Sequence, residues 1–121
     1  MIDIEDIGTP ETAAALGIPS YQVRGSLMEL RREGPALNLL EWKEPYDTSA
    51  PYAQLNHLGI ARIALQSTDL DADIIRLKAE GVEFFSDPVI PDEPLSFLRI
   101  VCLKDPDGTV IELVELFPGL R

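Results

Sequence analysis

Strand-forming residues fill two stretches in the first half of the chain, and a short polar segment separates them. The stretches are Tyr21–Leu30 and Ala36–Trp42, and the segment between them is the charged turn Arg31–Gly34. This pattern predicts a β-hairpin. The next stretch, Lys43–Gln54, has two prolines and no apolar period, which predicts an exposed connection between two halves of the chain.

In the second half, the pattern predicts the order strand, helix, strand, strand, strand. Strands are expected at Leu55–Leu65, Val82–Phe85, Leu95–Leu103 and Thr109–Glu115. The turn Asp105–Gly108 joins the last two strands, because proline presets φ early in a turn and glycine supplies a positive φ later.

One amphipathic helix is predicted within this order. Thr68 or Asp69 provides its N-cap, and Gly81 ends it. The apolar positions of its inner face recur at helical spacing: Leu70, Ile74 and Leu77. The helix is therefore expected to cover one face of a sheet.

The last strand of each half has the same sequence pattern. A shift of 74 residues places Ala36–Glu41 on Val110–Glu115 without a gap, and Asn38 then falls on Glu112. We interpret the two halves as an internal repeat. The first half lacks an opening strand and most of a helix, and Met1–Ile7 is a candidate for a short substitute strand.

Length and composition indicate one ordinary globular domain. The chain has 121 residues, of which 45% are hydrophobic and 26% charged. This is enough for a single core and is not the composition of a disordered protein. Within that domain, we expect a partial first module at residues 1–45, a linker at 46–54 and a complete module at 55–117.

Net charge and the N-terminal sequence exclude some classes of partner and indicate a location. A formal charge of -11 repels phosphate backbones and anionic lipids, so nucleic acid and membrane surfaces are poor partners. No apolar run approaches the roughly 18 residues of a spanning helix, and the N-terminal sequence lacks the basic segment of a secretory signal. We therefore expect a cytoplasmic protein.

The last strand contains a carboxylate in an unusual position. Glu112 lies between apolar neighbours in a strand that should pack into a sheet, where a charge without a partner costs free energy. A partner cation is therefore expected beside it. Glu41 and Glu115 lie three residues beyond Asn38 and Glu112, on the opposite face of their strands, and are expected to face solvent.

Two residue types occur once and limit the possible chemistry. His57 is the single histidine, so a site with two histidines from one chain is excluded. Cys102 is the single cysteine and lies in an apolar strand. It is expected to be a small buried hydrophobic residue rather than a nucleophile.

Several motifs follow one another in the order seen in a known superfamily. They are the strand start His57–Ile60, the helix start Asp69–Asp71, and the segments Ala79–Phe84 and Asp105–Glu115. Together with the repeat, they resemble the glyoxalase/bleomycin-resistance/extradiol-dioxygenase family, the vicinal oxygen chelate superfamily. The resemblance implies an α+β fold in which βαβββ modules form a curved mixed sheet around a cleft, here with a truncated first module.

The resemblance also implies a metal site. The family holds a divalent ion with side chains from the first and last strands of each module. His57 and Glu112 match these positions in the second module, Asn38 matches the last-strand position of the first, and the remaining position has no counterpart. The implied ion is Ni, Co, Zn, Mn or Fe, with Glu112 as ligand or catalytic base and Asn38 as a ligand-positioning residue.

Two functions follow from the resemblance. One is a metal-dependent lyase or isomerase that acts on a small oxygenated substrate through an enediolate-type intermediate. The alternative is a non-catalytic, bleomycin-resistance-like protein that binds a small cationic or aromatic molecule, which the negative charge and the incomplete ligand set favour.

Two aromatic residues and one sheet edge complete the expected site. Trp42 and Phe97 are candidates for the wall of a ligand cleft, with packing at a strand end or in the core as the competing interpretation. A first sheet without its opening strand leaves an unpaired edge. This predicts a homodimer, because a two-fold assembly can cover that edge.

Overall fold

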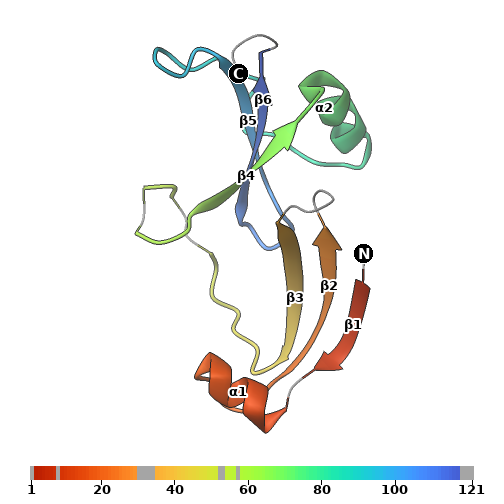
Figure 1. Cartoon of the computed structure of the whole chain (residues 1–121). Coiled ribbons are helices and arrows are strands. Elements are labelled where there is room, and N and C mark those ends of the chain that lie inside the picture. Colours follow the sequence, from red (N-terminus) through yellow and green to blue (C-terminus); the bar gives the residue numbers. More distant parts are fainter. Residues whose placement is uncertain (1, 8, 30–34, 52–53, 57, 118–121) are drawn as a thin grey trace. The chain divides into compact units, whose positions relative to one another are not determined.

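The computed structural model describes residues 2–7, 9–29, 35–51, 54–56 and 58–117, with backbone alone for 2–7. The elements in chain order are β1 (Ile2–Ile7), α1 (Pro10–Leu16), β2 (Gln22–Glu29), β3 (Ala36–Glu44), β4 (Arg62–Ser67), α2 (Leu70–Ala79), β5 (Leu98–Lys104) and β6 (Val110–Leu116) (Figure 1). They form two compact units, Met1–Thr48 and Ser49–Arg121, and each is described by itself. The division falls within the expected linker.

The first unit is an antiparallel sheet with the strand order β1-β2-β3. The predicted hairpin is confirmed, since β2 and β3 pair from Gln22 with Glu44 to Glu29 with Ala36. The second strand of the hairpin extends two residues beyond the predicted end at Trp42. The predicted turn at residues 31–34 lies outside the described residues.

Helix α1 closes one end of this sheet. The Thr9 side chain accepts a hydrogen bond from the backbone of Thr12, which satisfies an amide at the helix start. Gly17 ends the helix in the left-handed conformation with φ of 66°. The core of the unit consists of Ala13, Tyr21 and Val23, with Ile18 and Trp42 packed against them.

The predicted substitute strand forms, but it does not replace an opening strand. β1 pairs antiparallel with β2 and therefore lies on the side of β2 away from β3. In the second unit, the first strand instead pairs parallel with the last. Within the described residues, β3 has no neighbour equivalent to β4, so the first module is truncated as the sequence indicates.

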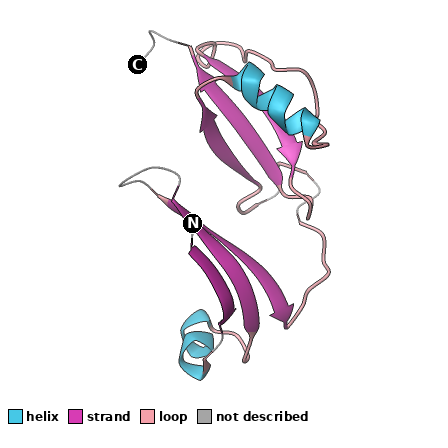
Figure 2. Cartoon of the chain, turned by 90° about the vertical axis from the view of Figure 1, so that its right-hand side faces the viewer, coloured by secondary structure: helices cyan, strands magenta, loops and turns pink. Residues whose placement is uncertain are grey.

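The second unit has a mixed sheet with the strand order β4-β6-β5. β4 runs parallel to β6, and β5 runs antiparallel to it. Helix α2 covers one face of this sheet (Figure 2). The arrangement is a βαβββ module in which the second strand is reduced to two isolated bridges, Phe84 with Leu103 and Val89 with Ile100.

Helix α2 follows the sequence prediction closely. The carboxylate of Asp69 is the N-cap and accepts a hydrogen bond from the Ala72 amide at 3.0 Å. The predicted inner face is confirmed, because Leu70 and Ile74 are buried and Leu77 packs against the same core. That core also contains residues of β5 and β6, namely Val101, Leu103 and Leu113.

The predicted strand Leu95–Leu103 forms but begins three residues later, at Leu98, and ends at Lys104. Two other predicted strands of this unit are wrong in extent. The first begins at Arg62 rather than at Leu55, because β6 begins at Val110 and offers no partner to earlier residues. Gly59 also breaks the extended backbone with φ of 110°. The predicted strand Val82–Phe85 is a single bridge.

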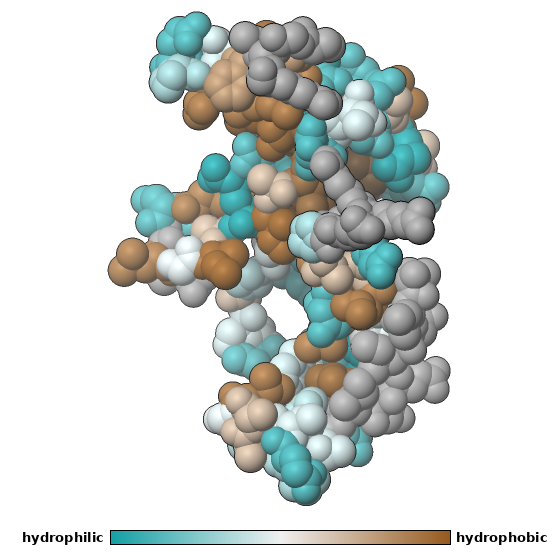
Figure 3. Space-filling view, viewed as in Figure 1, coloured by the Kyte–Doolittle hydropathy of each residue, from teal (hydrophilic) through white to brown (hydrophobic). Residues whose placement is uncertain are grey.

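The residues before β4 instead form an exposed segment with apolar side chains. Leu58 and Ile60 are 90% and 84% exposed. The space-filling view accordingly shows hydrophobic surface on the projecting segment that precedes β4 (Figure 3). These residues therefore contribute little to the core of the unit.

The predicted turn between the last two strands is confirmed. The carboxylate of Asp105 accepts hydrogen bonds from the amides of Asp107 and Thr109 at 3.0 and 2.8 Å. Gly108 has φ of 96°, which favours glycine. The Asp105 side chain is thus used within the turn itself.

Candidate functional site

The candidate site lies on the face of the β4-β6-β5 sheet opposite α2. Side chains alternate between the two faces of a strand, and Leu113 of β6 packs under α2, so Glu112 points to the other face. In the sheet register, Ala64 of β4 and Cys102 of β5 stand directly beside Glu112. We call this surface the Glu112 face. Its members are Arg62, Ala64 and Gln66 of β4, Leu98, Ile100, Cys102 and Lys104 of β5, and Val110, Glu112, Val114 and Leu116 of β6.

Glu112 has a cationic partner in Arg62. The side chain of Glu112 is 10% exposed and that of Arg62 is 49% exposed, and Arg62 Nε lies 2.5 Å from Glu112 Oε2. The expected partner cation is therefore a guanidinium at the start of β4. Arg62 could not be predicted as this partner, because the register that places β4 beside β6 cannot be read from residue pattern alone.

Cys102 is not an activated thiol in this environment. Burial raises its pKa, and the negative charge of Glu112 raises it further, while Arg62 lowers it by a smaller amount. A raised pKa keeps the sulfur protonated near neutral pH, and the thiolate is the nucleophilic form. This supports the interpretation of Cys102 as a small apolar residue rather than a nucleophile, but the side chain is half-buried and not buried as predicted.

On the opposite face, Glu115 is a structural residue rather than a solvent-facing one. Its side chain is 19% exposed, and Oε1 accepts a hydrogen bond from the Leu70 amide at 3.1 Å. Arg99 bridges Glu115 and Asp71, at 2.9 and 2.8 Å. The prediction of its face is correct, but solvent exposure is wrong, because Glu115 ties β6 to the start of α2. Glu41 is exposed as expected and pairs with Arg24.

Asn38 occupies the repeat position in the first unit. It is the third residue of β3 and stands opposite Leu27, as Glu112 is the third residue of β6 and stands opposite Cys102. Asn38 is exposed, whereas Glu112 is buried. The difference follows from the strand order, because β4 flanks Glu112 and no described strand flanks the corresponding side of β3.

Neither of the two aromatic candidates belongs to the Glu112 face. Trp42 packs in the core of the first unit, with its ring centroid 5.4 Å from that of Tyr21. Phe97 precedes β5 and accepts a backbone hydrogen bond from Phe117, beyond the end of β6. At about 3.4 Å per residue, Phe97 is on the order of 15 Å along the sheet from Glu112. Ligand contact by either ring stays a prediction.

The fold matches the crystal structure of a glyoxalase family protein from Bacillus cereus. The TM-score is 0.77 and the sequence identity is 21%, over 93% of this chain and 74% of that chain. The chain has the glyoxalase fold. The resemblance inferred from the sequence motifs is thus confirmed at the level of the fold, including its α+β class and mixed sheet. No family model matches the sequence, and no curated protein matches it at a significant level.

The described residues of this glyoxalase-fold chain do not form a metal-binding donor set. No group of three or more His, Cys, Asp and Glu side chains comes together in that part of the chain. Glu112 is engaged by Arg62, and Cys102 beside it is held as a thiol. His57, the other predicted ligand, lies outside the described residues. The described donors near Glu112 therefore do not by themselves fit a divalent ion, and metal binding stays a prediction that rests on the resemblance.

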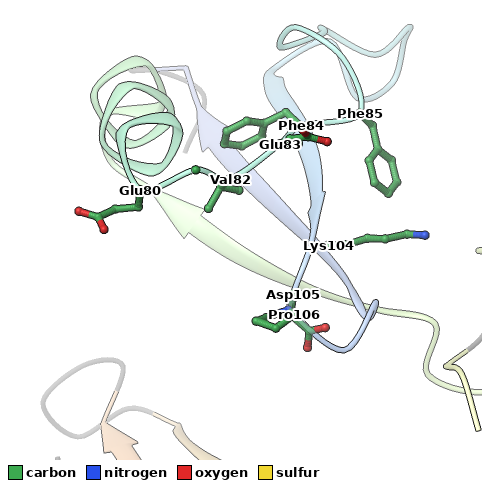
Figure 4. Close-up of a pocket in the computed structure, with 9 residues that line it drawn as sticks. Glu80, Val82, Glu83, Phe84, Phe85, Lys104, Asp105 and Pro106 are labelled. Atoms are coloured by element: carbon green, nitrogen blue, oxygen red, sulfur yellow. The ribbon is translucent and has the colours of Figure 1, made fainter. Parts of the chain in front are cut away.

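A separate pocket of about 480 Å³ lies at the edge of the second unit (Figure 4). It is lined by Glu80, Gly81, Val82, Glu83, Phe84, Phe85, Lys104, Asp105 and Pro106. None of the predicted site residues is among them. Lys104 is the one lining residue that also belongs to the Glu112 face, and its amino group lies 6.0 Å from the centre of the Phe85 ring.

Proposed function

We propose that this glyoxalase-fold protein binds a small molecule on the Glu112 face, as a bleomycin-resistance-like binding protein rather than as a metal-dependent lyase or isomerase. The observation that carries the proposal is the ion pair between the buried Glu112 carboxylate and Arg62. A metal ion bound by Glu112 would lie within a few ångströms of the guanidinium, where two cations repel strongly in a partly buried site. The pair therefore favours binding over metal-assisted chemistry.

The composition of the Glu112 face supports small-molecule binding. Most of its members are apolar, and Ile100, Val114 and Leu98 are only half-buried. Ligand sites combine apolar surface with a few polar groups that fix orientation. Arg62, Glu112 and Lys104 are the charged groups of this face. Such a face offers apolar contact together with a small number of directional contacts.

A ligand screen by thermal shift tests the proposal. A compound that binds the native state alone raises the melting temperature. Ala64 stands beside Glu112 and is exposed, so Ala64→Leu should block a ligand without removing a charge. Ile75 on α2 is 70% exposed and lies away from this face, so Ile75→Ala is the matched control. Stabilisation that survives Ala64→Leu for every compound found would contradict the proposal.

The lyase or isomerase remains the competing function, and metal titration separates the two. Catalysis through His57 and Glu112 requires that a divalent ion bind and that Glu112→Gln weaken its binding. We expect titration with Ni²⁺, Co²⁺ or Zn²⁺ to show no site that depends on Glu112. Calorimetry that finds tight binding lost in both His57→Ala and Glu112→Gln would favour the lyase.

The homodimer and the cytoplasmic location belong to the same proposal. Among the described strands, β3 has a neighbour on one side alone, which leaves an edge that a second copy can cover. Sedimentation that shows a stable monomer at micromolar concentration would contradict the dimer.

No helix in the described part of the chain is long and apolar enough to cross a membrane.

A further inference from the structure

One row of the Glu112 face carries two cations. In the sheet register, Arg62 of β4 and Lys104 of β5 stand on either side of Val110 of β6. All three point to the same side, because Val110 and Glu112 are two residues apart on one strand. The backbones of the outer strands are about 10 Å apart, which is two strand spacings. Arg and Lys side chains are long enough for both cationic groups to reach a common ligand.

The two cationic side chains of this row present hydrogen-bond donors to a ligand. The Glu112 carboxylate is already held by Arg62 through Nε, whereas the two terminal nitrogens of the guanidinium have no partner among the described residues. Lys104 is exposed, and its amino group lies over the Phe85 ring rather than against a carboxylate in that part of the chain. A group that accepts hydrogen bonds therefore complements this row.

We propose that Arg62 and Lys104 form the anchor for the carboxylate of a small aromatic or apolar acid. This rests on the proposed small-molecule function and specifies its ligand class. The outer edge of a guanidinium can bind a carboxylate with two hydrogen bonds, and an ammonium group adds charge-assisted contacts. The half-buried apolar side chains next to the row, Ile100 and Val114, provide contact for the rest of the ligand.

The ligand charge that this anchor favours is opposite to the one expected from the net charge of the whole chain. A formal charge of -11 favours cations in general. A cationic ligand at Glu112, however, would have to displace Arg62 from a carboxylate that is 10% exposed. The local arrangement therefore favours an anion, whose binding depends on two specific side chains rather than on the overall field.

Titration of the full chain with three probes tests this proposal. Benzoate carries the carboxylate, benzamide is its neutral analogue, and benzylamine is a cation of similar size. We expect benzoate to shift amide resonances of β4, β5 and β6 in ¹H–¹⁵N spectra and to bind about tenfold more tightly than benzamide, since a charge-assisted hydrogen bond contributes this much. Benzylamine should not compete with benzoate.

Matched variants assign the effect to the row. Lys104→Gln at an exposed position should weaken benzoate binding several-fold, whereas Lys78→Gln should not. Lys78 makes an equivalent contact, 6.0 Å from the Phe84 ring, but lies on α2. Arg62→Lys keeps a charge beside Glu112 and removes the planar fork, so it should fold and bind benzoate about tenfold more weakly.

Two results would overturn the anion anchor. One is equal affinity for benzoate and benzamide, and the other is unchanged benzoate affinity in both Lys104→Gln and Arg62→Lys. Failure of the ligand class can be separated from failure of the function. If benzoate fails while a compound from the thermal-shift screen still binds in an Ala64-dependent manner, only the anchor is wrong. If no compound binds in that manner, the proposed function fails as well.

Discussion

Removal of the Arg62 side chain from the ion pair with Glu112 should destabilise the second unit. Breaking a fully buried pair by removal of one partner costs about 3–5 kcal/mol, because the other charge stays buried without compensation. In this pair, Glu112 is 10% exposed but Arg62 is 49% exposed, so solvent already screens the interaction from one side. We therefore expect Arg62→Gln to lower the free energy of unfolding by about 1–2 kcal/mol.

The reciprocal substitution, Glu112→Gln, should lower the free energy of unfolding less than Arg62→Gln does. This asymmetry would identify the buried charge of Glu112 as the cause of the loss. In Glu112→Gln, the half-exposed guanidinium turns to water and no charge is left buried, so the expected loss is below about 1 kcal/mol. The double variant Arg62→Gln, Glu112→Gln should recover most of the loss seen in Arg62→Gln. The resulting double-mutant cycle should give a coupling of about 1 kcal/mol between the two positions.

Urea unfolding of the full chain measures these changes, and the aromatic content allows a second readout. Circular dichroism follows both units, whereas fluorescence of Trp42, the single tryptophan, reports the first unit in which it packs. Two results would refute this explanation. One is a free energy of unfolding for Arg62→Gln within about 0.3 kcal/mol of that of the unmodified chain, and the other is a larger loss of this free energy in Glu112→Gln than in Arg62→Gln.

Three further substitutions test the cores, a close backbone approach and a pH-dependent contact. Leu70 is fully buried, so Leu70→Ala should cost about 2–5 kcal/mol in urea unfolding; a loss below about 1 kcal/mol would mean that α2 is not packed as described. A Cβ at Gly25 would meet the backbone oxygen of Leu39 closer than real Cβ atoms approach, so Gly25→Ala should lower the melting temperature more than Ala15→Gly on exposed α1 does. The Ser67 hydroxyl donates to Asp73 at 2.7 Å and lowers the pKa of that carboxyl, as does Arg76 to a smaller extent. A carboxyl whose pKa is lower in the folded state than its unfolded value of about 4 stabilises the fold at higher pH, and this stabilisation is lost as the pH falls through the folded pKa. Ser67→Ala should therefore lower the free energy of unfolding at pH 7, and lower it progressively less below pH 4. A pH-independent difference would contradict this assignment.

Local patterns predicted the elements whose boundaries are set by nearby residues. The α2 helix is specified by the Asp69 cap and its apolar spacing, and the turn before β6 by proline and glycine at fixed positions. The β2–β3 hairpin pairs neighbouring stretches through a short turn, so its partners are also local. In each of these cases, chain neighbours carry the information.

Features that depend on distant partners could not be predicted in the same way. The start of β4 is determined by where β6 begins, 48 residues later at Val110. The same register brings Arg62 to Glu112, so the cation expected beside the carboxylate could be anticipated but not named. The place of β1 next to β2 is likewise a matter of pairing, because an acidic six-residue stretch does not specify its neighbour.

The central position of β6 has a consequence for hydrogen exchange. β6 has hydrogen-bonded neighbours on both sides, whereas β4 and β5 are each bonded to β6 along one edge within the described sheet, apart from two isolated bridges on β5. Amides of β6 are therefore expected to exchange with solvent deuterium most slowly in this unit, since their release requires that both pairings open. Glu112 is carried by that strand. If the segment before β4 or the loop before β5 frayed, the backbone of β6 that carries the Glu112 carboxylate would therefore keep its position.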